Sequence, residues 1–189
     1  DLSNQLLDFR KTESRGFKLN YVTTDVVLWL ETILHPFRPA FEQENKDFTA
    51  KLPELPFEAC LDREAFSKIV SNLVSNALKY SDSRIALELL PPAGEERMFT
   101  LLVTNDGHLI PDSEAENIFN PFYRLKETEN QLGSGIGLSL AHSLTEFHRG
   151  RLFYRQTPGG LNQFVLMLPE QQEDSFRIVA GNEKEKPEM

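Results

Sequence analysis

The sequence predicts an α/β fold, a two-layer sandwich in which one mixed, mainly antiparallel sheet carries helices on one face. Two observations predict this class. Segments with strand-like alternation are interleaved with segments whose apolar residues recur at helical spacing. The 189 residues, of which 40% are hydrophobic and 26% are charged, are enough to build one domain with a sizeable core.

Residues 1–15 place leucines and a phenylalanine at helical spacing, and Gly16 ends this helix. A helix this short cannot bury its apolar stripe alone, so we expect the end of a longer helix that packs on a partner. A disordered N-terminus is the alternative. Residues 17–23 alternate apolar and polar side chains and predict a strand.

Residues 25–41 predict a helix with an N-cap at position 24 or 25. Pro36 and Pro39 lie inside it, and each lacks a backbone donor, so we expect a kink or two shorter helices. Short strands follow over residues 47–52 and 57–61.

Asp62 can cap the strongest predicted helix, which reaches Tyr80. After it the pattern predicts strands over 84–90 and 98–105, joined by a hairpin loop over 91–96.

Residues 106–133 predict mostly loop, with one helical turn near 114–118. The last helix is expected over 135–148, and Gly150 is expected to end it. Strands over 151–156 and 162–168 complete the predicted domain.

Charge and composition exclude several function classes. The net charge of −9 argues against non-specific binding to nucleic acid or to an anionic membrane. The apolar run Val26–Leu30 is far too short to cross a bilayer, and no signal peptide opens the sequence. Cys60 is the single cysteine, and we expect it to be a small core residue in a reducing compartment.

The segment SNLVSNALKYS, residues 71–81, combines a buried stripe with a polar edge. At helical spacing Asn72, Asn76 and Lys79 fall on the same side of the helix. Amide oxygens can ligate Mg²⁺ and an ammonium can meet phosphate, so this edge could hold a metal-bound polyphosphate. An ordinary solvated helix edge is the alternative.

The segment VTNDGHLIP, residues 103–111, lies where a strand ends and the chain turns. Side chains alternate along a strand, so Asn105 and Asp106 are expected on opposite faces, one of them toward the core side where a base could lie. A simple Asn-Asp-Gly turn is the alternative.

The segment GSGIGLSL, residues 133–140, is a glycine-rich turn that opens a helix. The free N–H groups of a helix start favour phosphate, and glycine allows a close backbone approach. The spacing matches neither a P-loop nor a dinucleotide fingerprint.

Taken together and in this order, these segments resemble the ATP-binding catalytic domain of sensor histidine kinases, including those of hybrid two-component sensors. That domain belongs to the GHKL superfamily, with gyrase-type and MutL-type ATPases, and has a Bergerat-type ATP-binding fold. Residues 71–81 resemble its N box, 103–111 its first glycine box and 133–138 its second. IFNPFYR, residues 118–124, resembles the F box, and the likeness covers residues 16–169.

The flanks are interpreted from the same resemblance. Residues 1–15 resemble the end of the second helix of the preceding dimerisation domain, which carries the phosphoacceptor. Residues 170–189 are rich in Glu and Gln and predict an acidic, flexible linker.

The resemblance implies a set of ATP-binding residues. Asn72 and Asn76 would hold Mg²⁺, Lys79 would reach the terminal phosphates and Tyr80 would lie against the adenine. Phe119, Phe122 and Arg124 would anchor a short lid. The whole implied set is Asn72, Asn76, Lys79, Tyr80, Asn105, Gly107, Ile110, Arg124, Gly133, Ser134, Gly135, Ile136, Gly137 and Leu138.

The first glycine box departs from the family pattern Asp-x-Gly-x-Gly. Asn105 stands where the aspartate belongs, and Leu109 stands where the second glycine belongs. An asparagine can accept from the adenine amine through its carbonyl and donate to a ring nitrogen through its NH₂. We therefore expect Asn105 to contact the base.

The implied function is a protein histidine kinase fragment that binds ATP and Mg²⁺ and positions the γ-phosphate for transfer to a histidine outside the fragment. The alternative is a degenerate, nucleotide-free scaffold or interaction module. The phosphoacceptor of such kinases lies in a His-Glu-x-x-Thr-Pro motif. His35 lacks the acidic neighbour, and His108, His142 and His148 are expected to be ordinary loop, surface or helix-end residues, so the fragment alone should not autophosphorylate.

Implied partners are the dimerisation and phosphoacceptor domain of the same parent protein and a downstream receiver domain. We expect the fragment to be monomeric and the parent to be a homodimer. The resemblance places the fragment on the cytoplasmic side of a membrane-anchored parent, with no membrane or nucleic-acid contact of its own.

Overall fold

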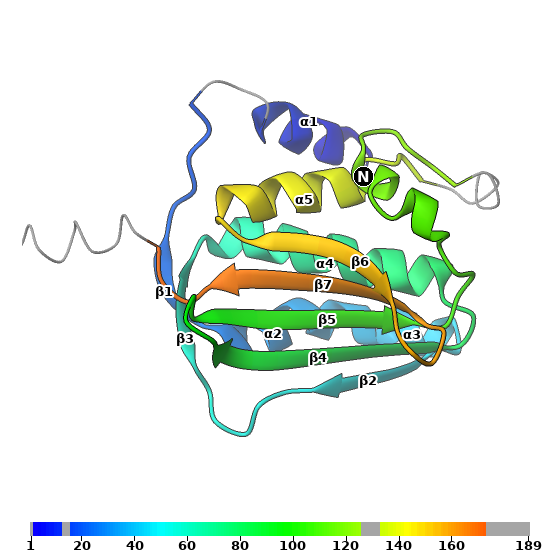
Figure 1. Cartoon of the computed structure of the whole chain (residues 1–189), viewed down its shortest axis with the longest axis horizontal. Helices are drawn as coiled ribbons and strands as arrows, with labels where there is room; N and C mark the ends of the chain where they lie inside the picture. The colour runs from blue at the N-terminus through cyan, green and yellow to red at the C-terminus, as the bar shows by residue number, and fades with distance from the viewer. Residues whose placement is uncertain (1, 13–15, 126–132, 173–189) are drawn as a thin grey trace, which may run out of the picture.

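A five-stranded sheet forms one layer of the structure, and helices cover one of its faces (Figure 1). The computed structural model describes residues 2–12, 16–125 and 133–172. In the sheet order β2-β4-β5-β7-β6, the pair β2–β4 is parallel and the other pairs are antiparallel. The strands are β2 (Asp47–Lys51), β4 (Arg84–Ala93), β5 (Met98–Asn105), β6 (Arg151–Gln156) and β7 (Asn162–Pro169). The predicted fold class is confirmed.

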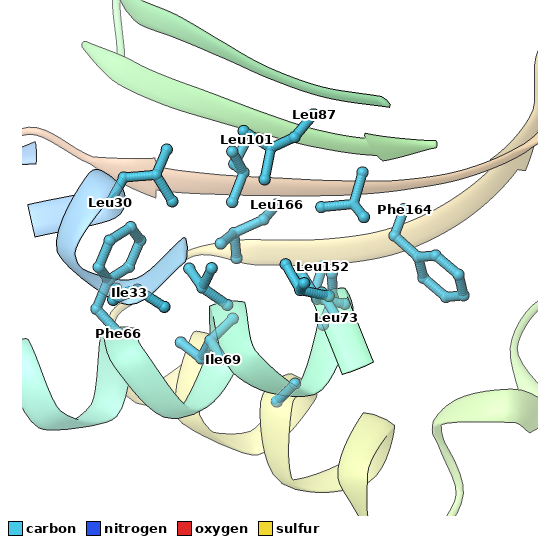
Figure 2. Packing of buried hydrophobic residues seen from close by; sticks show 14 of the residues in the cluster. Leu30, Ile33, Phe66, Ile69, Leu73, Leu87, Leu101, Leu152, Phe164 and Leu166 are labelled. Carbon is cyan, nitrogen blue, oxygen red and sulfur yellow. The ribbon is translucent and has the colours of Figure 1, made fainter. Parts of the chain in front are cut away.

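The helix α4 (Arg63–Tyr80) is the centre of the helical layer. Asp62 caps it as predicted, because its Oδ1 accepts from the N–H of Ala65 at 2.9 Å. Its apolar stripe meets the inward side chains of the sheet, as Phe66, Ile69 and Leu73 do in Figure 2. The buried residues of this stripe are Ala65, Phe66, Ile69, Val70, Leu73, Val74 and Ala77.

The predicted helix over 25–41 is divided at its prolines. The helix α2 (Val26–Leu34) passes through the 3₁₀ turn η1 (His35–Phe37) into α3 (Arg38–Gln43). Pro36 lies in η1 and Pro39 lies in the first turn of α3, where a missing N–H is tolerated. The expectation of two shorter helices is confirmed.

A second, two-stranded sheet pairs β1 (Val22–Asp25) with β3 (Glu58–Leu61). The strand predicted over 17–23 is therefore wrong for its first five residues. Two of their side chains instead contact the end of a helix. The centroid of the Phe17 ring lies 4.7 Å from that of the Phe147 ring, and Tyr21 OH donates to the Phe147 carbonyl at 2.9 Å.

The hairpin between β4 and β5 is tighter than predicted, because β4 continues through Pro91 and Pro92 to Ala93. The pairing of β2 with β4 ends at Glu88, so the prolines lie where β4 is an edge strand. They also coincide with a shift of register between Leu90 and Ala93. Edges and irregularities are where strands tolerate proline.

The loop predicted over 106–133 contains two 3₁₀ turns, η2 (Asp112–Glu114) and η3 (Asn117–Phe119), in place of the single helical turn expected. The following helix α5 (Gly137–Phe147) begins two residues later than predicted. Residues 126–132 of the predicted lid lie outside the described residues.

Gly150 ends α5 as expected, since its N–H donates to the Thr145 carbonyl at 2.9 Å, but the left-handed residue is the one before it. Arg149 adopts the left-handed conformation, with φ of 58°, while Gly150 does not. A Cβ on Gly150 would lie 2.4 Å from the carbonyl oxygen of Met167. Gly150 is therefore needed for the close approach of α5 to β7, rather than for its conformational freedom.

The helix α1 (Leu2–Thr12) packs against α5, as Figure 1 shows, and Phe9 is buried there. The predicted stripe thus has a partner within this chain. Leu6 and Leu7 keep 40% and 59% of their surface exposed, so part of the stripe is left uncovered. Among the described residues, no helix has both the length and the apolar character that a membrane crossing requires.

The predicted flexible linker is wrong for its first residues. The Cys60 N–H donates to the Glu170 carbonyl at 2.8 Å, and Gln172 Nε2 donates to the His148 carbonyl at 3.0 Å. Residues 170–172 are thereby held to the domain. Residues 173–189 of the predicted linker lie outside the described residues.

His148 is the C-cap of α5, a helix-end residue as expected, but it is fully buried and therefore not an ordinary surface group. Its Nδ1 lies 2.8 Å from the Leu144 carbonyl oxygen, and its Nε2 accepts from the Asp62 N–H at 3.2 Å. One ring nitrogen donates and the other accepts, so the native ring is neutral. Burial lowers the pKa of His148 below its ordinary 6.5.

We expect acid to destabilise the protein through this residue. His148 therefore binds a proton less readily in the native state than in the unfolded state, where its pKa is the ordinary 6.5. The free energy of unfolding should decrease as the pH falls through about 6.5, and this decrease should be smaller in His148→Gln. Urea titrations of the wild type and of His148→Gln measure this. A variant that keeps the full wild-type slope would contradict the assignment.

Candidate functional site

A cavity of about 410 Å³ lies beside the C-terminal half of α4. Its wall combines α4, the ends of β5 and β7, residues 118–125 and the glycine turn at 133–138. All residues of the predicted nucleotide-binding set line this cavity except Gly107 and Ile136. Ile136 is 1% exposed and belongs to the core. Gly107 contacts the cavity residue Asn105 through its backbone N–H, which donates to Asn105 Oδ1.

The polar edge of α4 faces the glycine turn. A Cβ on Gly137 would lie 2.9 Å from Asn72 Oδ1, and a Cβ on Gly133 would lie 2.5 Å from Lys79 Nζ. A side chain at position 137 would displace Asn72, and one at position 133 would displace the end of the flexible Lys79 side chain, so the two glycines let the turn lie close to α4. Asn72, Asn76 and Lys79 therefore share one cavity with the turn, as the sequence predicted.

Lys79 supplies the positive charge of this wall. Its Nζ donates to Tyr80 OH at 2.8 Å and lies 4.5 Å from the centre of the Tyr80 ring. Within the described part of the chain it has no carboxylate partner, so its charge is not neutralised by an acidic residue. An anionic group in the cavity would meet this ammonium.

The start of α5 adds a second attraction for anions. Ile136 at the N-cap makes no side-chain capping bond, so the first N–H groups of α5 are not capped by a side chain there. Gly135 precedes it with φ of 69°, and its carbonyl accepts from the Phe122 N–H at 3.0 Å. The positive end of the helix dipole thus lies at the glycine turn that lines the cavity.

The three F-box residues Phe119, Phe122 and Arg124 differ in their exposure and in what they contact. Phe119 is partly buried, with its ring 5.2 Å from that of His142. Phe122 is 63% exposed and is tied to the glycine turn through its backbone, so the anchoring role expected of its side chain is not seen. Arg124 lines the cavity.

Asn105 and Asp106 point to opposite faces, as predicted. Asn105 is 3% exposed and lines the cavity, whereas Asp106 accepts from the backbone N–H groups of residues 82, 83 and 84 at 2.9–3.0 Å. Partial burial favours the neutral acid, but these hydrogen bonds outweigh it and hold the pKa of Asp106 well below its ordinary 3.8. Asp106 therefore stabilises the turn after α4.

Asn162 is a cavity residue that the sequence analysis missed. It is the cross-strand partner of Asn105 and is 3% exposed. Its Nδ2 lies 3.3 Å from Asn105 Oδ1, and its Oδ1 accepts from the Ile110 N–H at 3.1 Å. Asparagine is depleted in strands, and this was the available signal for a special role.

The bidentate contact expected of Asn105 stays a prediction, and the partners of its amide oxygen bear on it. Its carbonyl oxygen already accepts from the Gly107 N–H at 3.1 Å and from Asn162 Nδ2. These donors hold the carbonyl oxygen of Asn105 toward the protein and leave its NH₂ toward the cavity.

Gln5 is a second residue that the sequence did not indicate. It reaches the cavity from α1, where its Nε2 lies 3.4 Å from Asn72 Oδ1 and its Oε1 accepts from Ser134 Oγ at 3.0 Å. Nothing in the local sequence pattern distinguishes this glutamine from other polar helix residues.

Comparison with known proteins shows the family of this chain. The family model described as histidine kinase-, DNA gyrase B-, and HSP90-like ATPase matches residues 61–172, which contain the whole predicted nucleotide-binding set. A similar curated protein is the sensor histidine kinase WalK of Bacillus subtilis, 27% identical over 180 residues. The match covers 93% of this chain but 29% of WalK, so the chain spans less than a third of this relative.

Two solved structures have the same fold. Full-length ShkA in complex with AMPPNP superposes with a TM-score of 0.77 at 19% identity, over 89% of this chain and 35% of that one. Histidine kinase ThkA in complex with the response regulator protein TrrA superposes with a TM-score of 0.73 at 20% identity, over 89% of this chain and 47% of that one.

Proposed function

Since the chain belongs to the histidine kinase-, DNA gyrase B-, and HSP90-like ATPase family, we propose that its cavity binds ATP together with Mg²⁺ and presents the γ-phosphate to a histidine of another domain. One observation carries this proposal. Asn72, Asn76 and Lys79 line the same cavity as the uncapped start of α5. Amide oxygens, an ammonium and free N–H groups together suit a metal-bound polyphosphate.

The residues present fit Mg²⁺. Asn72 and Asn76 offer two neutral amide oxygens, and among the described residues Asn72 Oδ1 accepts only from Gln5, in a long hydrogen bond of 3.4 Å. Mg²⁺ in nucleotide sites is held by one or two protein oxygens, by phosphates and by waters. When bound, the ion would neutralise charge on the phosphate oxygens.

The chemistry of the chain itself is positioning and charge neutralisation. Lys79 and the N–H groups of Gly137 and Leu138 would bind the phosphates and fix their direction. Arg124 would add positive charge from the opposite wall. Phosphoryl transfer depends mainly on such orientation and electrostatic stabilisation, so no covalent intermediate with this domain is needed.

The proposed activity depends on other domains. We propose that residues 1–15 end the second helix of a dimerisation domain that carries the acceptor histidine, and that residues 16–169 form the catalytic domain. A receiver domain would take the phosphoryl group next, in keeping with the response regulator bound to ThkA. The parent would be a membrane-anchored homodimer with this part in the cytoplasm, and this chain alone would be monomeric and unable to autophosphorylate.

The Asn76→Ala variant tests the site. We expect this variant to bind ADP in the presence of Mg²⁺ roughly 10- to 100-fold more weakly than the wild type, because it loses an oxygen ligand. Calorimetric titration with ADP and with a non-hydrolysable ATP analogue, with and without Mg²⁺, measures this.

Asn20→Ala is the matched control. Asn20 is exposed, and its only hydrogen bond in the described structure uses its backbone N–H, to Asp62. We expect wild-type binding in this variant. Absence of binding by the wild type at millimolar nucleotide would refute the proposal and favour a nucleotide-free scaffold. If binding is found, radiolabelled ATP and an added phosphoacceptor domain test the transfer step, with label expected on that domain only.

A further inference from the structure

The amide of Asn105 is turned so that its oxygen faces the protein. The Gly107 N–H donates to Asn105 Oδ1 at 3.1 Å, and Asn162 Nδ2 donates to the same atom at 3.3 Å. The direction of these two donors decides which end of the amide faces them, because only the oxygen can accept.

The orientation of Asn162 is fixed independently. Its Oδ1 accepts from the Ile110 N–H at 3.1 Å, and its Nδ2 lies 3.1 Å and 3.0 Å from the carbonyl oxygens of Gly107 and His108. Asn162 must therefore present NH₂ to Asn105. Turning the Asn105 amide over would set its NH₂ against two donors in a buried place, which is unfavourable.

The other end of the amide, Asn105 Nδ2, is open to the cavity. It has no hydrogen-bond partner among the described residues, and it is not among their buried unpaired atoms. Ile110 and Phe164 line the same cavity and flank Asn162. Two apolar side chains beside one hydrogen-bond donor suit a ligand with a flat ring that has apolar faces and one acceptor on its edge.

We propose that this cavity reads a purine base through a hydrogen-bond donor, Asn105 Nδ2, and so accepts adenine and guanine nucleotides with little discrimination. Adenine offers the ring nitrogen N1 as acceptor, and guanine offers the carbonyl O6. A carboxylate at position 105 would instead accept from the adenine amine and repel the guanine carbonyl. This inference rests on the proposed nucleotide site.

The Asn105→Asp variant tests the inference by replacing the donor with an acceptor. We measure the dissociation constants of ADP and GDP with Mg²⁺ by calorimetry. The wild type should bind the two within about tenfold of each other, and Asn105→Asp should shift their ratio toward ADP by about tenfold or more. The control Asn20→Asp adds the same charge at an exposed position and should leave the ratio unchanged.

If Asn105→Asp has the same ratio of ADP to GDP dissociation constants as the wild type, the inference is overturned. If ADP still binds in that case, the proposed function remains supported. If neither nucleotide binds the wild type, both fail.

A second measurement needs no variant. The 5′-diphosphate of purine riboside keeps N1 but lacks the exocyclic amine, and the wild type should bind it within about threefold of ADP. A loss of more than about tenfold would show that the amine is read by an acceptor and would overturn the inference.

Discussion

Gly107→Ala is expected to lose nucleotide binding while the domain remains folded. A Cβ at this position would lie 1.8 Å from the carbonyl oxygen of Tyr80 and 3.2 Å from Asn105 Oδ1. The first contact is with backbone, so the end of α4 or the loop after β5 must move. A forced shift of this kind costs about 1–3 kcal/mol in a packed site, and we expect ADP affinity to fall on the order of 100-fold.

Calorimetry with ADP and thermal unfolding together measure this effect. Gly159→Ala is the matched control, because a Cβ there would meet nothing closer than Thr157 Oγ1 at 3.8 Å. Its affinity for ADP should equal that of the wild type. Wild-type affinity in Gly107→Ala would mean that the contact between this loop and Tyr80 does not shape the site.

Phe66→Ala is expected to give the largest loss of stability. Phe66 is fully buried in α4 and lies between the sheet and α2 (Figure 2), with its ring 6.1 Å from that of Phe99. Removing a buried aromatic side chain destabilises a protein by about 3–5 kcal/mol, because transfer energy is lost and a cavity remains. Urea unfolding followed by far-UV circular dichroism gives this difference in free energy.

Leu28→Ala serves as the control for this prediction. Leu28 lies on the neighbouring helix α2 but is 61% exposed. Its removal should change the free energy of unfolding by no more than about 0.5 kcal/mol. A loss below about 1 kcal/mol in Phe66→Ala would contradict the central place given to α4.

The features that the sequence predicted well depend on neighbouring residues. Asp62 caps α4 through an N–H three residues away, and the stripe on α4 repeats at helical spacing. Pro36 and Pro39 divide their helix through the missing N–H groups of the same turns. Asn72 and Asn76 lie four positions apart on one helix, so their common face followed from helix geometry alone.

The predictions that failed were made from local sequence patterns that fit more than one structure. Phe17 and Tyr21 alternate as strand residues do, but they contact the end of α5 instead of a neighbouring strand. Gly150 was expected to end α5 through its conformational freedom, but Arg149 is the left-handed residue and Gly150 provides space beside β7. The pattern alone could not show which distant segment each of these residues meets.

The sequence by itself determined most helices and strands, the cap of α4 and the common side of Asn72, Asn76 and Lys79, because these follow from spacings within one or two turns of chain. Only the tertiary structure decided which distant residues line the cavity together. Asn162 reaches Asn105 from 57 residues away, and Gln5 reaches Ser134 from 129 residues away. Such pairs depend on strand order and register, which are set by burial over the whole core. The direction of the Asn105 amide follows from them, because the donors that fix it converge only once the sheet and its loops are assembled.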